Sequence, residues 1–420
     1  MVGSSPIQLN RTGHLLSIFA FGHLATAEDW LTWRGPKGDG LSQEKAVLAS
    51  WSANENVIWR VKLPAPGNSS PIVANGKVLI TQATDEGKKR SLLCFDQDSG
   101  SKLWEKNIDY PEKEPTHKTN PFCPASPSTN GKTIVVNHGS AGMFAYDFSG
   151  KELWRRTDLG NQRHIWGTAP SPVPYKETFI QNRGPGPRVL LIAVAADTGK
   201  TVWERQLKQA QGKDEKHWFG SWSTPVLRNN HGRDELLIGL PKRLVAFDPK
   251  TGNEIWSCNG LGDLVYNNAV ASGDHVLATS GYGGPALAVK AGRNASGDIT
   301  SQRLWLTKKR NLQRIGTGVA FEDHYYILTE PGILQCIEIA TGKIVKQARV
   351  GKGGNWGSVT HVGGKLLVTN QAGQTIIFSA TPDFEIKKIN PINELTRGSP
   401  AFSNGQVFIR TYEHLWCLGK

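Results

Sequence analysis

Residues 94–104 read CFDQDSGSKLW, and the same spacing returns at residues 246–256 as AFDPKTGNEIW. In both copies an apolar strand ends at an aspartate, a glycine follows four residues later, and a tryptophan closes the stretch. An aspartate side chain can accept backbone N–H bonds in a turn, and glycine readily adopts the positive φ that such a turn needs. The stretch therefore predicts a β-hairpin whose returning strand carries a tryptophan.

Three further copies follow the same plan with small departures. They are 145–154 (AYDFSGKELW), 195–203 (AADTGKTVW) and 336–346 (CIEIATGKIVK), and Lys346 stands where the last copy should carry its tryptophan. Upstream of the hairpins lies a second signature, typically a serine or threonine with proline before an apolar strand, clearest at 70–80 (SPIVANGKVLI). Eight strand starts match this position: Ser70-Pro71, Ser126-Pro127, Ser171-Pro172, Thr224-Pro225, Ala269-Val270, Gly318-Val319, Ser358-Val359 and Ser399-Pro400.

Successive starts lie about 40 to 56 residues apart, which is the length of one four-stranded propeller blade. The last copy stops at 415–418 (LWCL) without a returning tryptophan strand, whereas 56–61 (NVIWRV) precedes the first start and has no hairpin of its own. Pairing these two segments closes the ring without a free edge. The sequence therefore predicts an all-β fold, an eight-bladed β-propeller of four-stranded antiparallel blades that an N-terminal strand closes.

The repeated tryptophans are expected to be structural. Each would dock from the outer strand of its blade onto the neighbouring blade and bury a large apolar area. The outer strands are predicted at Trp59, Trp104, Trp154, Trp203, Trp256, Trp305, Lys346 and residues 384–386.

The composition agrees with many short strands joined by turns, since the 420 residues include 46 glycines, 23 prolines and 14 tryptophans. Lysine and arginine total 49 against 36 acidic residues, a formal net charge of +13. Such a charge favours anionic partners. The basic residues are scattered rather than clustered, so they indicate a solvated basic surface and no specific nucleic-acid site.

The first 27 residues resemble a secretory signal, because Arg11 precedes an apolar stretch at 15–24 that ends in Ala25-Thr26-Ala27. We therefore expect an exported protein, periplasmic or extracellular. The chain is divided into a signal peptide (1–27), an N-terminal extension (28–55) and the propeller (56–420). No later stretch approaches the roughly 20 apolar residues of a transmembrane helix.

Five cysteines are widely spaced and include no C-x-x-C pair, so no metal site is indicated. Cys94, Cys336 and Cys417 each lie in an apolar strand-like run, which favours the role of a small buried hydrophobe. A disulfide between Cys123 and Cys258 is an open alternative.

The pattern A-x-D-x-x-T-G-x-x-x-W resembles the tryptophan-docking motif of the PQQ-like repeat family. That family includes quinoprotein alcohol dehydrogenases and the propeller of the bacterial outer-membrane assembly lipoprotein. The resemblance covers about residues 56–418, nearly all of the chain after the predicted signal peptide. Residues 29–36 (DWLTWRGP) resemble the W-x-x-W-R-G-P opening of exported PQQ-like repeat proteins of planctomycete-type bacteria.

In a propeller, the loops that lead into the innermost strands gather at one end of the central channel, where ligands bind. Here those loops carry aromatic, cationic and amide side chains, which suit a planar anionic ligand or sugar rings with carboxylate or sulfate groups. The predicted ligand-binding residues are His117, Asn120, Arg163, His164, Trp166, His217, Trp218, Trp222, Tyr266, Asn267, Arg314, Asn355, Trp356 and Arg397.

These features favour a non-catalytic binding or scaffold propeller, with a protein, an anionic glycan or a small molecule at the channel face and no cofactor. The first alternative is a PQQ-dependent alcohol or sugar dehydrogenase. For that activity the resemblance implies an adjacent Cys-Cys disulfide, a Ca²⁺ held by acidic and amide oxygens, and an aspartate base. The sequence has no adjacent cysteines and no c-type haem motif, and the acidic residues nearest the loop positions are Asp214, Glu215 and Asp263.

The second alternative is a polysaccharide lyase that acts on anionic glycans. In such an enzyme a histidine or tyrosine removes the proton next to a uronic carboxylate, while an arginine or asparagine neutralises that carboxylate. The residues of these types are His164, His217, Tyr266 and Arg314, and their spacing is not diagnostic.

Overall fold

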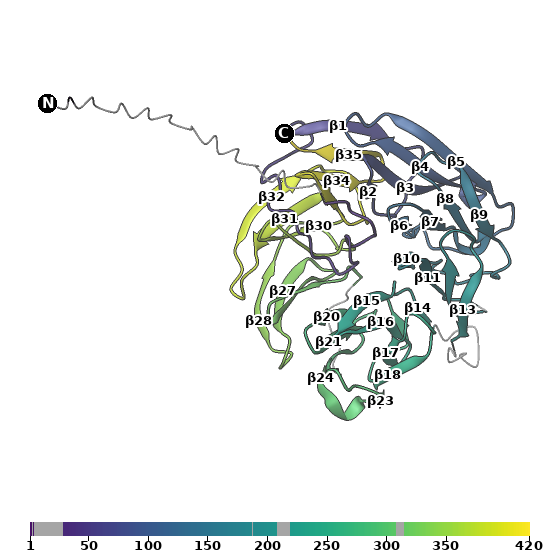
Figure 1. Cartoon of the computed structure of the whole chain (residues 1–420), viewed down its shortest axis with the longest axis vertical. Coiled ribbons are helices and arrows are strands. Elements are labelled where there is room, and N and C mark those ends of the chain that lie inside the picture. Colours follow the sequence, from purple (N-terminus) through teal and green to yellow (C-terminus); the bar gives the residue numbers. More distant parts are fainter. Residues whose placement is uncertain (2, 4–27, 187, 208–218, 308–314) are drawn as a thin grey trace.

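The structure is a ring of small β-sheets (Figure 1), and we call the region that their innermost strands surround the channel. It is a computed structural model that describes residues 1, 3, 28–186, 188–207, 219–307 and 315–420. Within these ranges, 35 β-strands form seven four-stranded sheets, one five-stranded sheet and one two-stranded sheet. The four- and five-stranded sheets are eight blades, so the predicted eight-bladed propeller is confirmed. No helix in the described ranges is long and apolar enough to cross a membrane.

The first four blades follow the chain in order, each from its innermost to its outermost strand. Blade 1 contains β2 (Ile72–Ala74), β3 (Lys77–Thr84), β4 (Lys89–Asp96) and β5 (Lys102–Asp109). Blade 2 contains β6 (Ser128–Thr129), β7 (Ile134–Asn137), β8 (Met143–Tyr146) and β9 (Glu152–Arg156). Blade 3 contains β10 (Val173–Tyr175), β11 (Thr178–Arg183), β12 (Leu190–Ala195) and β13 (Thr201–Gln206). Blade 4 contains β15 (Val226–Asn230), β16 (Arg233–Leu240), β17 (Arg243–Phe247), β18 (Glu254–Asn259) and the added β23 (Gly297–Asp298).

The remaining blades complete the circle. Blade 5 contains β20 (Val270–Ser272), β21 (His275–Thr279), β22 (Ala286–Lys290) and β24 (Arg303–Thr307). Blade 6 contains β25 (Val319–Phe321), β26 (His324–Leu328), β27 (Ile333–Glu338) and β28 (Ile344–Arg349). Blade 7 contains β29 (Thr360–Val362), β30 (Lys365–Thr369), β31 (Gln374–Ser379) and β32 (Ile386–Pro391). Blade 8 contains β33 (Ala401–Ser403), β34 (Gln406–Arg410), β35 (His414–Leu418) and β1 (Val57–Lys62).

Five short elements lie outside this scheme. A parallel pair, β14 (Gly220–Ser221) and β19 (Leu264–Val265), joins the loops that lead into blades 4 and 5. The 3₁₀ turns are η1 (Asp85–Gly87), η2 (Gly139–Ala141) and η3 (Thr300–Gln302).

The N-terminal strand closes the ring as predicted. β1 pairs antiparallel with β35, with Trp59 opposite Cys417 and Lys62 opposite His414. Figure 1 shows the two strands side by side in blade 8, next to the C-terminus. The first and last parts of the chain therefore share one sheet, and neither β1 nor β35 is left as a single unpaired strand.

The repeated tryptophans dock on the next blade, as predicted. The indole N–H of Trp203 in blade 3 donates to the Pro249 carbonyl in the β17–β18 turn of blade 4, at 3.0 Å. The motif glycine of that turn, Gly252, has φ +68°, and a Cβ added to it would lie 2.4 Å from the Trp203 ring. This glycine is needed both for the turn and for the close approach of the indole. Trp59, Trp104, Trp154 and Trp305 donate in the same way to Gln97, Phe148, Ala196 and Ile339.

Lys346 takes over the docking role where the tryptophan is missing. Its ammonium group donates to the Asp383 carbonyl in the next turn, at 2.9 Å, and lies 5.2 Å from the centre of the Phe384 ring. A lysine can thus supply both the donor and the contact with the neighbouring blade.

Trp256 is the exception among the docking tryptophans. It is fully buried with Ala291, Ala295 and Ile299, but its indole N–H has no hydrogen-bond partner. The reason is that blade 5 replaces the tight hairpin with residues 291–302, which include η3 and β23. Docking there is entirely apolar.

A belt of hydrogen bonds runs around the channel at the predicted strand starts. In each blade one backbone N–H donates to the side-chain oxygen of the equivalent residue in the next blade, over 2.7 to 3.1 Å. In blades 5 and 6 the belt residue lies one position before the predicted start. The belt residues are Ser70, Ser126, Ser171, Thr224, Asn268, Thr317, Ser358 and Ser399.

Removing one belt hydroxyl should destabilise the ring. In Ser171→Ala the buried N–H of Ser126 loses its acceptor, so we expect the free energy of unfolding to fall by about 1–2 kcal/mol. Ser171→Thr is the matched control because Thr224 fills the same position in the next blade. Urea denaturation of both variants measures the difference. Equal stability of the alanine and threonine variants would contradict a role for the hydroxyl.

The segment predicted as an N-terminal extension forms a strap across one end of the channel, opposite the end where the predicted ligand-binding loops lie. We call residues 28–52 the strap. Trp30 exchanges two backbone hydrogen bonds with Val73 of β2, at 2.7 and 3.0 Å. The Leu31 carbonyl then accepts from Thr129 of β6. Val73 and Thr129 each lie three residues after their belt residue, so the strap contacts the innermost strands beyond the belt.

The strap then crosses to the far side of the ring. Arg34 donates to the carbonyls of Thr317 and Gly318 at the start of blade 6, at 3.0 and 2.8 Å. Further along, Gly40 accepts from the backbone N–H of His361 in β29 of blade 7. The predicted ligand-binding loops precede the belt in each blade, whereas most strap contacts follow it. The two therefore lie at opposite ends of the channel.

Candidate functional site

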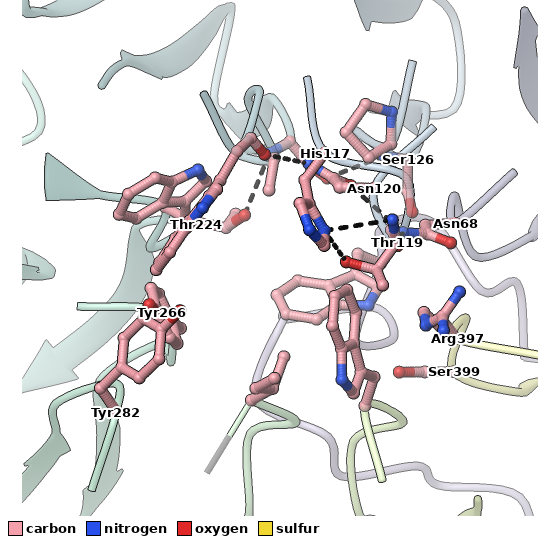
Figure 2. Close-up of a pocket in the computed structure, with 18 residues that line it drawn as sticks. Asn68, His117, Thr119, Asn120, Ser126, Thr224, Tyr266, Tyr282, Arg397 and Ser399 are labelled. Atoms are coloured by element: carbon pink, nitrogen blue, oxygen red, sulfur yellow. Dashed lines mark hydrogen bonds between the residues drawn. The ribbon is translucent and has the colours of Figure 1, made fainter. Parts of the chain in front are cut away.

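The end of the channel opposite the strap contains a cavity of about 250 Å³, which we call the cup (Figure 2). All eight blades contribute to its lining, and Trp33 is the one strap residue that also reaches it. The lining residues are Trp33, Asn68, His117, Thr119, Asn120, Pro124, Ser126, Trp166, Ala169, Ser171, Trp222, Thr224, Tyr266, Tyr282, Ile315, Trp356, Arg397 and Ser399.

One wall of the cup is aromatic and comes from blades 3, 4 and 5. The ring centres of Trp166 and Tyr282 lie 4.8 Å apart, and those of Trp222 and Tyr266 lie 5.3 Å apart. The indole N–H of Trp222 donates to the Gly167 carbonyl at 2.9 Å, which fixes that ring. The wall is therefore a cluster of rings that support one another before any ligand arrives.

The loop after β21 explains how two of these rings reach the cup. A Cβ added to Gly281 would lie 2.2 Å from the ring of Tyr266, so only glycine leaves room for that side chain. The next residue, Tyr282, has φ +51° and is 56% exposed. The glycine-rich stretch at 281–284 (GYGG) thus supplies an accessible ring for stacking.

Tyr266 keeps its proton at any physiological pH. Burial raises the pKa of its hydroxyl well above the ordinary range, with a smaller contribution from Tyr282. The hydroxyl oxygen is buried and has no hydrogen-bond partner in the structure. A ligand oxygen that entered the cup could pair with it, since an unpaired buried hydroxyl costs free energy.

The opposite wall is cationic and comes from blades 7 and 8. The Arg397 guanidinium lies 5.0 Å from the centre of the Trp356 ring and 5.3 Å from that of Tyr412, whose hydroxyl accepts its hydrogen bond. Glu330 lies nearby, and burial raises the pKa of its carboxyl. Figure 2 places Arg397 and Ser399 across the cup from Tyr266 and Tyr282. A ring with an anionic group could therefore contact both walls.

The third side is formed by amides and a histidine from blades 1 and 2. Asn120 donates to the carbonyls of Trp166 and Thr168 in blade 3, at 2.8 and 3.0 Å, and its own carbonyl accepts from Asn68. These amides chiefly join neighbouring blades. His117 is exposed, and one ring nitrogen contacts the Thr119 hydroxyl at 2.7 Å.

The structure brings seven of the predicted ligand-binding residues into the lining of the cup. They are His117, Asn120, Trp166, Trp222, Tyr266, Trp356 and Arg397. The sequence reasoning did not predict Tyr282 or Trp33, or the belt hydroxyls Ser126, Ser171, Thr224 and Ser399. The serine or threonine repeated at six of the eight strand starts was a usable signal for the hydroxyls.

Four predicted residues lie outside the lining. His164 packs edge-on against Trp222 with ring centres 4.8 Å apart. Arg163 is half exposed and pairs with Glu112 at 3.7 Å. Asn267 and Asn355 are buried and donate to backbone carbonyls, Asn267 to Ile315 and Gly316, and Asn355 to Leu328 and Gly357. His217, Trp218 and Arg314 lie outside the described residues.

The residues of the lyase alternative are only partly described. Burial lowers the pKa of His164 to about 4, so this ring is neutral at physiological pH. A neutral imidazole can accept a proton in principle, but His164 does not line the cup. His217 and Arg314 lie outside the described residues.

The described lining of the cup does not fit a Ca²⁺-bound quinone. Ca²⁺ needs several oxygen ligands, including carboxylates, and the described lining has none. The five cysteines are separate, buried free thiols, so Cys123 and Cys258 form no disulfide. Asp263 pairs with Lys242 at 2.5 Å and does not line the cup. Asp214 and Glu215 lie outside the described residues.

One acidic cluster in the described residues is close enough together to hold a metal ion, but the Glu394 carboxylate already accepts hydrogen bonds from other side chains. Glu394, Glu413 and His414 lie together on blade 8. Glu394 accepts hydrogen bonds from the Trp416 indole and the Thr411 hydroxyl and contacts the His414 ring. The cluster thus joins the last hairpin to the preceding loop and lies outside the cup.

Comparison with known proteins gives one family and several similar structures. A family model described as outer membrane protein assembly factor BamB matches residues 10–157 and 88–348, which together span more than half of the chain. The structure resembles BamB from Moraxella catarrhalis, with 14% sequence identity, a TM-score of 0.59, and coverage of 86% of this chain and 96% of that chain. A search of curated proteins finds no match.

Two other solved structures have the same fold. Quinohemoprotein alcohol dehydrogenase from Comamonas testosteroni has 12% identity, a TM-score of 0.63, and coverage of 93% of this chain and 80% of that chain. The computationally designed Ika8 protein has 12% identity, a TM-score of 0.56, and coverage of 90% and 100%. Similarity at this level of identity concerns the scaffold, since unrelated functions share one fold.

Proposed function

Because the chain belongs to the family of outer membrane protein assembly factor BamB, the PQQ-like repeat propellers, we propose that it is a non-catalytic binding propeller whose ligand occupies the cup. The observation that carries the proposal is the pair of facing walls. A preformed cluster of aromatic rings stands opposite Arg397, the one formally charged side chain in the described lining. This arrangement suits a ring-shaped ligand with a carboxylate or sulfate group, such as a uronate or sulfated sugar.

The same proposal includes export. Nearly all of the signal-like segment, residues 2 and 4–27, lies outside the described residues, and its sequence supports a periplasmic or extracellular location. The positive net charge of +13 would draw anionic glycans toward the protein in that setting.

Tyr282 provides the most direct test because it lines the cup and is 56% exposed, so loss of its ring should cost little stability. We expect Tyr282→Ala to weaken binding of uronate-containing or sulfated oligosaccharides by about fivefold to tenfold, the loss of one stacking contact. Isothermal titration calorimetry with a panel of such oligosaccharides measures the effect, with neutral oligosaccharides of equal length for comparison.

Tyr282→Phe is the matched control, since it keeps the ring and should bind like the original protein. The melting temperature of both variants should be unchanged. If no member of the panel binds, or if Tyr282→Ala binds as tightly as the original protein, the glycan proposal fails.

The two catalytic alternatives predict that the protein converts its ligand into a product, whereas a binding propeller only holds the ligand. A quinoprotein dehydrogenase would reduce a dye when the chain is supplied with PQQ, Ca²⁺ and an alcohol. A lyase would release unsaturated uronates, which absorb in the ultraviolet. Binding without either product is the result we expect, because the described lining contains neither a carboxylate for Ca²⁺ nor His164.

A further inference from the structure

A second cavity, of about 590 Å³, lies between the strap and the innermost strands of blades 3, 4 and 5. We call it the crevice. One side is formed by strap residues 32–34 and 36–39, and the other chiefly by β10, β15 and β20 with the residues just before them. Pro225, Val226 and Val270 make much of its lining apolar. It lies on the strap side of the belt, whereas the cup lies on the loop side, and Trp33, Ser171 and Thr224 line both cavities.

The innermost strand of each blade has one free edge, and the strap shows how that edge pairs. Val73 in β2 is opposite Val78 in β3, and its N–H and C=O both bond to Trp30 of the strap. In an antiparallel pair, residues alternate between bonding to the partner strand and pointing away from it. The backbone N–H and C=O of a residue three positions after the belt therefore point away from the second strand of the blade and toward the channel.

Leu227 and Ala271 occupy the position of Val73 in blades 4 and 5. Leu227 is opposite Leu236, and Ala271 is opposite Val276, in the same register as Val73 and Val78. Both residues line the crevice and are partly exposed. Among the described residues, the free-edge N–H groups of these two have no backbone partner beyond their own sheets. Such unpaired edges can pair with an added extended chain.

Blade 3 differs at this position because it carries Pro174. Proline has no N–H to offer, and it is tolerated on an edge whose N–H side is unpaired. The blade therefore shows that a proline three residues after the belt fits this fold.

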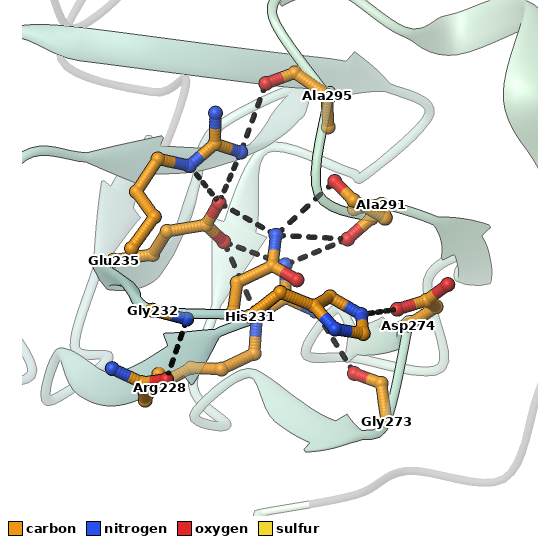
Figure 3. Close-up of polar contacts among 12 residues, drawn as sticks. Arg228, His231, Gly232, Glu235, Gly273, Asp274, Ala291 and Ala295 are labelled. Atoms are coloured by element: carbon orange, nitrogen blue, oxygen red, sulfur yellow. Dashed lines mark hydrogen bonds and ion pairs between the residues drawn. The ribbon is translucent and has the colours of Figure 1, made fainter.

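The wall of the crevice beside Leu227 is rigid. Arg228 donates two hydrogen bonds to Glu235, at 2.6 and 3.1 Å, and two more to the carbonyls of Gly273 and Ala291 in blade 5 (Figure 3). Although burial acts to raise the pKa of Glu235, hydrogen bonds from Asn230, Arg228 and Arg233 hold it below its ordinary value. The network fixes blades 4 and 5 relative to each other, so both edges are preorganised for one ligand.

We propose that the crevice binds an extended segment of a partner protein, which bridges the backbone of Leu227 and Ala271 as Trp30 bridges Val73. The bound segment continues the backbone pairing that the strap makes with blades 1, 2 and 7. It places an apolar side chain against the lining formed by Pro225, Val226 and Val270. Recognition thus combines backbone hydrogen bonds with an apolar pocket.

The test uses a displayed library of linear peptides of about 12 residues, selected on the full chain. Enriched peptides are synthesised, and their binding is measured by fluorescence anisotropy. We expect Leu227→Pro and Ala271→Pro each to weaken binding by about tenfold or more, because each removes one N–H donor. Leu227→Ala and Ala271→Ser keep the donors and should stay within about twofold. Unchanged melting temperatures show that all four variants fold.

Amide hydrogen exchange locates the bound peptide. Slowed exchange in residues 226–230 and 270–272 on addition of peptide supports the proposal. The proposal is overturned if no peptide is enriched, or if the proline variants bind as tightly as the original chain. Tyr282→Ala in the cup should not change peptide binding, so failure of the crevice and failure of the cup are distinguishable.

Two other occupants would also overturn it. If sedimentation shows self-association that the proline variants lose, the crevice is an interface between two copies. If its amides are protected without peptide in the full chain but not in a chain that starts at Glu28, the chain's own first residues fill the crevice.

Discussion

Replacing Trp203 by alanine is expected to lower the free energy of unfolding by about 3–5 kcal/mol, the cost of deleting a buried indole. The side chain is 7% exposed and packs into the core shared by blades 3 and 4. The substitution also removes the indole N–H that donates to the Pro249 carbonyl. Urea denaturation followed by circular dichroism measures the loss. Val202→Ala is the matched control, because Val202 is adjacent in the same strand but 52% exposed, and it should cost about 0.5 kcal/mol or less.

The partner glycine gives a second route to the same contact. Gly252→Ala places a methyl group 2.4 Å from the Trp203 ring at a φ of +68°, so it should destabilise the protein by a similar amount. When Gly252→Ala is combined with Trp203→Ala, the added methyl group no longer clashes with an indole. The glycine substitution then costs only the backbone strain of about 1 kcal/mol. The two losses should therefore be clearly less than additive. Full additivity would show that the glycine and the tryptophan act independently.

The fold was predictable because its information is local and repeated. Each hairpin carries its own turn residues, and copies such as 94–104 and 246–256 can be compared along the chain. Ring closure was also predictable, since residues 57–61 and 415–418 each lacked a partner. In blades 5 and 6 the motif position was predicted one residue too late, at Ala269 and Gly318. The belt residues there are Asn268 and Thr317.

The strap and half of the cup were not predictable in the same way. Residues 30–41 have no strand periodicity, and their partners, such as Val73 and His361, lie far away in the sequence. An amide in a channel loop looks the same whether it faces a ligand or a carbonyl. Asn267 and Asn355 could therefore not be distinguished from true lining residues before the structure showed their backbone partners.

Arg34 holds the strap on the far side of the channel, and Arg34→Ala should release it. The guanidinium is buried and donates to the carbonyls of Thr317, Gly318 and Asp39 over 2.8 to 3.0 Å. Burial lowers the pKa of Arg34 to about 10, so the group stays charged at neutral pH. Its removal leaves three carbonyls without this donor, and we expect a loss of about 2–4 kcal/mol in the free energy of unfolding.

Release of the strap in Arg34→Ala should also move Trp33, the residue before it, which lines both the cup and the crevice. A released strap is cut faster by chymotrypsin between Trp33 and Leu41, which mass spectrometry of the fragments detects. Arg34→Lys keeps the charge but cannot donate in the same forked geometry, so it should recover only part of the stability. The exposed Lys37→Ala is the control and should change neither property. Unchanged proteolysis of Arg34→Ala would show that Trp30 and the blade 7 contacts hold the strap without this residue.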